Sequence, residues 1–318
     1  MNNHDKKIKE TLASALQNHQ KNNFQVAEDL YKKIIKIDPS HADSHNNLGF
    51  LFKELGKNKE ALTCYKNAIL ANPNFTLAVN NLSNLLKEIR LSNVTLTNSS
   101  GLKKLILLLF KRNDINHRDI FQNAKSLLFI TESNDQLKKI VNSNSLLLKN
   151  QIIQNLLKED LFLLMLQKSL MADYFLEQIL TKLRNEILFA LNNSDENILR
   201  ENFNFIISLA EQCFLNEYVY SQDKKEIDYI NQLKNSLENK KEVNELKIAI
   251  LSCYLPLCSS ENIMNKLLKY ESKNILFSDL INMQIREPLE EKKLLTSFKS
   301  LGHISDDVSK KGREQYEK

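Results

Sequence analysis

The sequence predicts an all-α protein, in which a short superhelix of repeated helix pairs is followed by an irregular helical bundle or solenoid. Glycine and proline, which the tight turns between strands require, number only 5 and 4 in 318 residues. Apolar residues recur at helical spacing along most of the chain. The first ninety residues also contain an internal repeat, so we expect a regular array at the start of the chain and a less regular body after it.

The repeat has a period of 34 residues, and its copies carry the same residue types at matching positions. The matched pairs are Ala27 and Ala61, Tyr31 and Tyr65, Pro39 and Pro73, and Leu48 and Leu82. The most complete copy contains "ADSHNNLGFLFKELGKNKEALTCYKNAILANP". This period and pattern resemble the tetratricopeptide repeat, in which each unit is a pair of helices.

Each residue of the second copy that matches the repeat pattern has a packing role. Gly49 and Ala61 are small where the two helices of the pair approach each other, and Tyr65 fills the gap beside them. Gly56 ends the first helix, and Pro73 stops the second because proline lacks the backbone N–H that a continuing helix needs. The one departure is a histidine, His45, at the position that is usually aromatic.

The array is short. We expect a degenerate first copy at about 8–41, a second at 42–75 and a partial third at 76–90, where the pattern is lost at "RLSNVTLTNSS". The second helix of the third copy is missing, so its first helix is expected to act as a cap. Isolated repeats cannot bury their apolar faces, so the array is expected to lean on the helices that follow it.

Two asparagines, Asn47 and Asn81, stand at equivalent positions on successive first helices, which line the concave face of such arrays. A side-chain amide can donate to a peptide C=O and accept from a peptide N–H, so this column is a candidate peptide-binding site. The alternative is that both are surface asparagines in an asparagine-rich chain. Ala13 is at the equivalent position of the first copy, which limits any ladder of amides to two members.

The rest of the chain is predicted to be helical without the repeat period. We expect repeats over 1–90, a linker over 91–101, a helical domain over 102–280 and a separate C-terminal segment over 281–318. Apolar stripes predict helices near 118–130, 135–142, 145–157, 160–171, 176–191, 203–214, 225–238, 244–254 and 261–270. The stripe over 203–214 includes Cys213, which is interpreted as a buried, unreactive thiol rather than a nucleophile.

Composition argues against several kinds of function. Five glycines cannot build a phosphate-binding or dinucleotide-binding loop, so no cofactor is expected. The cysteines and histidines do not have the spacing of a metal site, and no catalytic pair stands out. The net charge of +5 is spread without a basic patch, so nucleic acid is not an expected partner, with RNA binding kept as the weakest alternative. Apolar runs fall short of the roughly 20 residues of a membrane span, and a reduced, cytoplasmic protein is expected.

Five later stretches, taken in order behind the repeats, resemble a family of bacterial fusions. These proteins join tetratricopeptide repeats and a helical middle region to a class I S-adenosylmethionine-dependent methyltransferase domain. The resemblance covers about residues 8–317, and it is specific as an ordered set only. The stretches are "LTKLRNEILFAL", "ISLAEQCFLNEYVY", "IAILSCYLPL", "QIREPLEEKKL" and "SLGHISDDVSKKGREQYE".

In that family the last stretch leads into the methyltransferase domain, whose residues have no counterpart here. Gly312 also departs from the usual apolar residue. The resemblance therefore implies a chain that is not itself an enzyme, and no cofactor-binding residue is carried over. The expected partner is a protein or peptide, with a separate methyltransferase domain as one possibility. The alternative function is the substrate-recruiting or regulatory part of such a methyltransferase.

Overall fold

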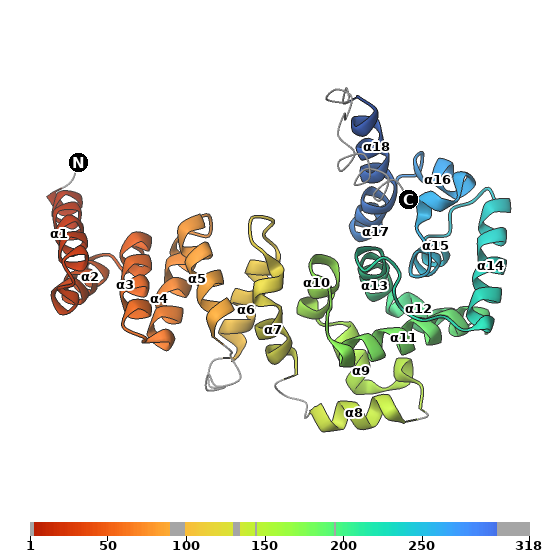
Figure 1. The fold of residues 1–318 in the computed structure, drawn as a ribbon, viewed down its shortest axis with the longest axis horizontal. Coiled ribbons are helices and arrows are strands. Elements are labelled where there is room, and N and C mark those ends of the chain that lie inside the picture. Colours follow the sequence, from red (N-terminus) through yellow and green to blue (C-terminus); the bar gives the residue numbers. More distant parts are fainter. Residues whose placement is uncertain (1–2, 90–98, 130–133, 144, 194, 298–318) are drawn as a thin grey trace, which may run out of the picture.

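The computed structural model describes the chain except at a few breaks, and every regular element in the described part is helical, with no strand (Figure 1). The predicted all-α fold is therefore confirmed. The helices α1 to α7 follow one another along the long axis, and those from α8 onward form a wider arc (Figure 1). The described residues are 3–89, 99–129, 134–143, 145–193 and 195–297.

The repeat array consists of two helix pairs and one further helix. They are α1 (Asn3–Gln20), α2 (Phe24–Ile37), α3 (Ala42–Glu54), α4 (Asn58–Ala71) and α5 (Thr76–Glu88).

The remaining helices are shorter on average and have no common period. They are α6 (Ser99–Phe110), α7 (His117–Leu128), α8 (Asn134–Asn142), α9 (Gln151–Leu157), α10 (Asp160–Lys168), α11 (Tyr174–Asn192), α12 (Glu196–Glu201), α13 (Phe203–Leu215), α14 (Lys224–Asn239), α15 (Glu245–Ser252), α16 (Glu261–Leu267), α17 (Ile275–Ile281) and α18 (Glu287–Ser297). Two short 3₁₀ turns, η3 (Leu147–Lys149) and η4 (Leu257–Ser259), and a π-helical turn, η5 (Asn282–Arg286), complete the set.

Many of the abundant asparagines begin helices. The side chains of Asn116, Asn150, Asn244 and Asn274 each accept a hydrogen bond from a backbone N–H in the first turn of the helix that follows. Such a cap satisfies an N–H that has no partner within the helix. Asn150 also explains why the helix predicted over 145–157 is divided: it ends η3 and begins α9.

The packing predicted for the second repeat is present. A Cβ atom added to Gly49 would lie 2.8 Å from Cε1 of Tyr65, so only glycine lets α3 and α4 approach this closely. Ala61, Tyr65 and the equivalent Tyr31 are fully buried. Gly56 adopts a φ of 70°, the left-handed conformation that favours glycine just after a helix end.

The helix α5 is covered by α7, which packs on it directly. Near the ends of α1 and α3, a basic side chain reaches an acidic one at the end of the following first helix: His19 with Glu54 at 2.6 Å and Lys53 with Glu88 at 2.8 Å. Lys87, in the last turn of α5, lies 3.3 Å from Asp119, but Asp119 is in the first turn of α7. The contact between α5 and α7 therefore does not repeat the end-to-end pairing of the first helices.

A buried amide secures this step. Asn123 of α7 donates to the carbonyl oxygen of Leu86 at 2.5 Å and to that of Ile89 at 3.2 Å. These carbonyls lie at the end of α5, where the last C=O groups of a helix have no N–H donors within the helix. The sequence period has been lost here, so only the three-dimensional contact shows that α7 covers the end of α5.

The two predicted boundaries fare differently. Most of the linker predicted over 91–101 lies outside the described residues, but 99–101 belong to α6. The boundary predicted between 280 and 281 falls inside α17, which runs on through η5 into α18. Gln284 of η5 is fully buried: it accepts from the Leu257 N–H at 3.2 Å and donates to the Ala210 carbonyl at 3.3 Å. The start of the predicted C-terminal segment is thus part of the helical body, and 298–318 lie outside the described residues.

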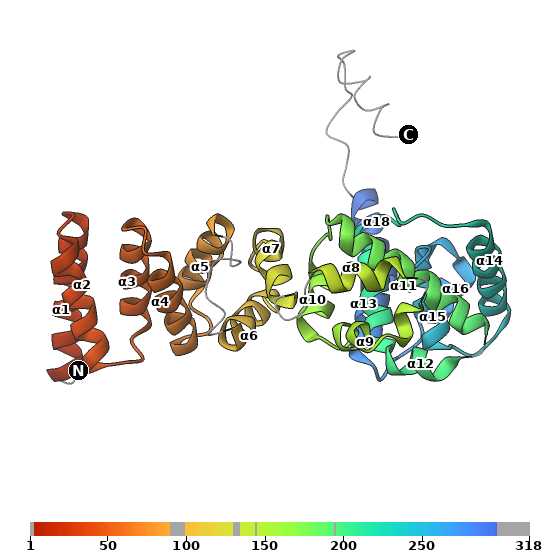
Figure 2. The same ribbon diagram turned by 90° about the horizontal axis from the view of Figure 1, so that it is seen from below.

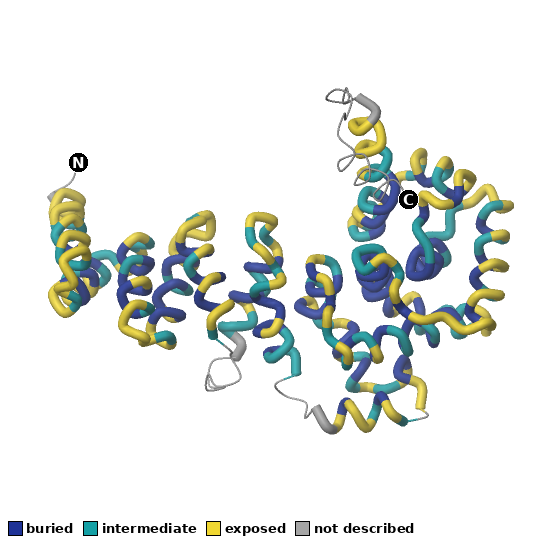
Figure 3. Tube along the Cα trace, in the orientation of Figure 1, coloured by how far each residue is buried: buried dark blue, intermediate teal, exposed yellow. Residues whose placement is uncertain are grey.

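The core runs through the whole described chain as one apolar cluster, from Ala15 to Ile285. The helix α13 lies at its centre in the second half, packed against α10, α15 and α17 (Figure 3). The view from below shows that the array and the body are joined in one elongated molecule (Figure 2). In the part of the chain that the structure describes, no helix combines the length and the apolar character needed to cross a membrane.

Candidate peptide-binding face of the repeat array

The candidate site lies on the first helices of the array, α1, α3 and α5. Here α3 contacts α5 directly, whereas the second helices α2 and α4 make no comparable contact. The first helices are therefore closer together at this step, and the array curves toward them. Ala13, Asn47 and Asn81 form one column across this side, separated by 34 residues each.

Asn47 and Asn81 are connected through a third amide. Asn81 donates from Nδ2 to Oδ1 of Asn46 at 2.9 Å, and Asn46 donates from Nδ2 to Oδ1 of Asn47 at 3.4 Å. Asn46 is buried at 2% exposure, whereas the other two side chains are half-buried. Sequence reasoning missed Asn46, although the doubled asparagines in "HNNLG" and "VNNLS" were a signal that two amides occupy each helix turn.

This chain of amides leaves one donor and one acceptor unused. Nδ2 of Asn47 and Oδ1 of Asn81 have no partner among the described residues. In Asn47 and in Asn81, the bond to Asn46 fixes the amide plane, and this sets the direction of the unused atom of each side chain. The face thus offers an N–H on α3 and a C=O on α5, the two groups that complement a peptide unit.

Apolar side chains flank the amides. Phe50 follows Asn47 by one helical turn and is 44% exposed, and Leu77 precedes Asn81 by one turn and is 53% exposed. Leu16 of α1, at the position equivalent to Phe50, is 38% exposed. The Phe50 ring lies 5.8 Å from the His19 ring, centroid to centroid, which holds it against the array.

Other residues considered in the sequence have structural places. Cys213 and Cys253 are buried, and burial raises the pKa of the Cys64 thiol to about 12, so that thiol is not a nucleophile at neutral pH. His41 caps α3 by accepting from the Ser44 N–H, and His45 bonds the Pro39 carbonyl at 2.9 Å. Among the described residues, no group of three or more His, Cys, Asp or Glu side chains could hold a metal ion.

Stacked helix pairs of this kind define a helical-repeat protein. More particularly, the sequence model of the family described as "Tetratricopeptide repeat" matches residues 42–75, which are α3, α4 and the turn after them. This match coincides with the second copy expected from the sequence. No curated protein matches the chain.

Proposed function

We propose that this chain is a non-catalytic interaction module that binds an extended segment of a protein partner across α1, α3 and α5. The observation that carries the proposal is the pair of unused amide atoms, Nδ2 of Asn47 and Oδ1 of Asn81, on neighbouring first helices. In this proposal they bond the backbone of the bound segment, because an amide N–H and an amide C=O complement a peptide unit. The match to the tetratricopeptide repeat supports a role in protein–protein interaction.

The apolar neighbours supply contact area for the partner's side chains. Phe50 and Leu77 lie one turn to either side of the amides, so a bound segment would cover both. Burying such side chains on binding contributes about 25 cal/mol per Å² of apolar surface. Backbone bonding without sequence readout, combined with two apolar contacts, suits a partner segment defined by extended shape and a few apolar residues.

The test is to select peptides from a random displayed library on the purified chain, then to measure their affinity by fluorescence anisotropy. The double variant Asn47→Ala with Asn81→Ala is expected to weaken binding about tenfold, the loss of roughly two net hydrogen bonds. Thermal unfolding must show that the fold is retained, since Asn81 also bonds Asn46.

The matched control removes two amides elsewhere. Asn67 on the second helix α4 and Asn231 on α14 have no hydrogen-bond partner among the described residues, so Asn67→Ala with Asn231→Ala should leave affinity unchanged. Equal losses in both double variants, or no loss in either, would remove the proposal.

A second candidate is that the module recruits substrate for, or regulates, a methyltransferase domain. Supporting it, four of the five stretches that resemble the fusion family bond one another. Arg184 of the first reaches the Tyr220 carbonyl of the second at 3.4 Å, and the Tyr254 hydroxyl of the third donates to the Arg184 carbonyl at 2.9 Å. Gln284 of the fourth bonds the second and third stretches, at Ala210 and Leu257.

These contacts show only that the four stretches pack together, so the test lies in the gene and in solution. Coding sequence for "NPYPRW" downstream of the codon for Lys318 would favour this candidate. The chain by itself is expected to give no calorimetric signal with S-adenosylmethionine. A clear signal would overturn the non-catalytic assignment.

A further inference from the structure

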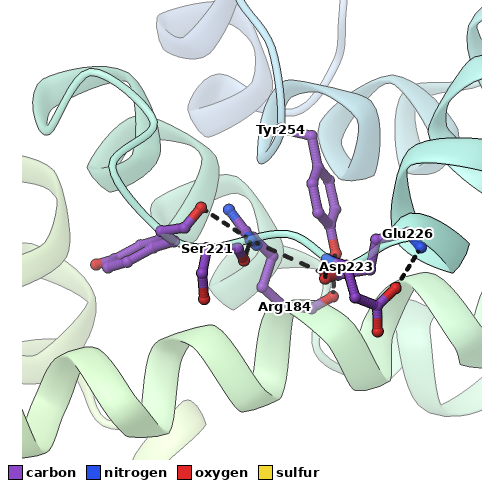
Figure 4. A network of polar contacts seen from close by, with 6 residues as sticks. Arg184, Ser221, Asp223, Glu226 and Tyr254 are labelled. Carbon is purple, nitrogen blue, oxygen red and sulfur yellow. Dashed lines mark hydrogen bonds and ion pairs between the residues drawn. The ribbon is translucent and has the colours of Figure 1, made fainter.

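A second groove lies far from the repeats, between α11 and the segment that leads into α14 (Figure 4). It has a volume of about 720 Å³. One face of α11 forms one wall, and residues 219–223 with the start of α14 form the other. The lining residues are Tyr174, Glu177, Gln178, Thr181, Lys182, Asn185, Val219, Tyr220, Ser221, Gln222, Asp223 and Glu226.

Arg184 of α11 fixes the second wall from beneath. Its Nη2 donates to the Ser221 carbonyl at 2.6 Å and to the Tyr220 carbonyl at 3.4 Å. Its guanidinium is fully buried and lies over the Tyr254 ring, 4.3 Å from the centroid. Figure 4 shows Arg184 and Ser221 joined across the gap between α11 and this segment. The wall is therefore held in place before any ligand arrives.

The backbone entering this wall is strained. Glu217 and Tyr218, two consecutive residues that are not glycine, have φ values of 56° and 59°. Such conformations cost of order 1–3 kcal/mol each and persist only where the surroundings enforce them. They direct the chain so that Val219 stands out at 69% exposure, beside the groove.

The charges of the groove are unevenly compensated. Glu226 accepts from the Tyr254 hydroxyl at 3.0 Å and from the Asp223 N–H at 2.9 Å, and it lies 3.9 Å from Nη2 of Arg184. The one lining cation, Lys182, donates to the carbonyls of Val141 and Ser143, at 3.2 and 2.8 Å, and keeps its positive charge.

Two carboxylates remain available. Glu177 has no partner among the described residues, and Asp223 uses only Oδ1, which accepts from the Glu226 N–H. The three lining carboxylates, Glu177, Asp223 and Glu226, outnumber the two cations, Lys182 and the buried Arg184, so the groove has a net negative charge. Its lining also includes two exposed side chains that are aromatic or apolar, Tyr174 at 76% and Val219 at 69% exposure.

We infer that this groove is a second docking site, for a basic segment of a partner protein in which Lys or Arg alternates with an aliphatic residue. The Tyr174 ring can take a cationic side chain on its face, and Glu177 and Asp223 can bond the same cation. An arginine suits this set because its planar fork bonds carboxylates in pairs and stacks on aromatic rings. Val219 supplies the contact for the neighbouring aliphatic side chain.

The experiment uses the full chain and two fluorescent probe peptides, one of alternating Arg and Leu and one of alternating Glu and Leu. The basic probe is expected to bind at least tenfold more tightly than the acidic one at low salt, and more weakly as salt rises. The variant Glu177→Gln with Asp223→Asn should weaken the basic probe about tenfold. Asparagine at 223 keeps the acceptor for the Glu226 N–H, so α14 retains its cap.

Matched controls separate this site from net charge and from the repeats. Glu242→Gln with Glu271→Gln removes two exposed carboxylates outside the groove and should leave binding of the basic probe unchanged. Asn47→Ala with Asn81→Ala should also leave it unchanged. Equal affinity for both probes, or equal effects of both charge-removing pairs, would overturn the inference.

Discussion

The repeat array and the helical body solve the same packing problem in two ways. In the array, the contacts between helices recur: Tyr31 and Tyr65 are buried at equivalent positions, and hydrogen bonds between a basic and an acidic side chain join residues 35 apart at two successive steps. In the described part of the body, individual buried polar groups such as Arg184 and Gln284 join particular helices. The comparison teaches that a sequence period can specify how helices stack, whereas helices without a period need specific buried contacts to fix their arrangement.

The physical reason lies in the cost of burying polar groups. A buried polar group without its partner costs free energy, so the bonds from Nη2 of Arg184 to the Ser221 and Tyr220 carbonyls disfavour arrangements of helices that break them. The Lys53–Glu88 pair of the array is partly exposed, where such a pair contributes about 0–1 kcal/mol. Register in the array therefore comes mainly from the shape of small and aromatic residues, with the bond between Asn46 and Asn81 as one buried polar contact. Register in the body relies more on such polar contacts.

The largest expected effect is on Arg184. Replacing it in Arg184→Met removes the bonds to the Ser221 and Tyr220 carbonyls and leaves Glu226 buried without its cation. The loss in free energy of unfolding is expected to be about 3–5 kcal/mol, the usual cost of breaking a buried pair. Urea unfolding of the full chain measures it.

The control for Arg184 is Arg200, whose side chain is largely exposed and pairs with Glu196 on the same helix. Arg200→Met should change stability by less than about 0.5 kcal/mol. If Arg184→Met changed the free energy of unfolding as little as Arg200→Met, buried polar contacts would not be what fixes the helices of the body.

A second effect concerns pH and Glu211 of α13. Burial raises the pKa of this carboxyl to about 8, with Asp279 raising it further and Lys168 and Gln167 lowering it. Its Oε2 has no hydrogen-bond partner among the described residues. The folded protein therefore binds a proton that the unfolded chain, with a pKa near 4.5, has lost.

The sign follows from linkage: folding is favoured at low pH, and this contribution is lost as the pH rises from about 4.5 to about 8. Glu211→Gln keeps the uncharged form at every pH. The stabilisation is the free energy of unfolding of the variant minus that of the wild type. It is expected to be on the order of 3 kcal/mol larger at pH 8.5 than at pH 5. Thermal unfolding at the two pH values measures the difference, and a pH-independent difference would contradict the assignment.

The smallest of the three effects tests the array. In Gly49→Ala, the new Cβ would meet the buried Tyr65 ring at 2.8 Å and Cys64 Cβ at 3.2 Å. Overpacking of this kind is expected to cost about 1–3 kcal/mol. The control is Gly101→Ala in α6, where nothing lies within 4 Å and where alanine should add about 0.5–1 kcal/mol of helix stability. Equal responses at the two glycines would show that close approach does not set the register.

Residue types with a repeated local role were predictable. Gly49, Tyr65 and Gly56 were placed correctly because the 34-residue period links each type to one packing task. The packing of α7 on α5 was not predictable in detail, because the contact of Lys87 with Asp119 joins residues 32 apart and has no counterpart in the sequence pattern. The candidate face was predictable in Asn47 and Asn81 but not in Asn46, whose burial depends on the neighbouring helix.

The amino-acid sequence by itself determined the helical class, the repeat over 42–75 and the small residues that pack it, because these depend on spacing within one or two helices. Only the tertiary structure decided that α7 covers α5, that 281–286 belong to the body, and that Arg184 lies beneath a groove. These features depend on contacts between residues far apart in the chain. No local sequence pattern encodes such contacts, because each occurs at one place in the molecule and forms only when distant segments have folded together.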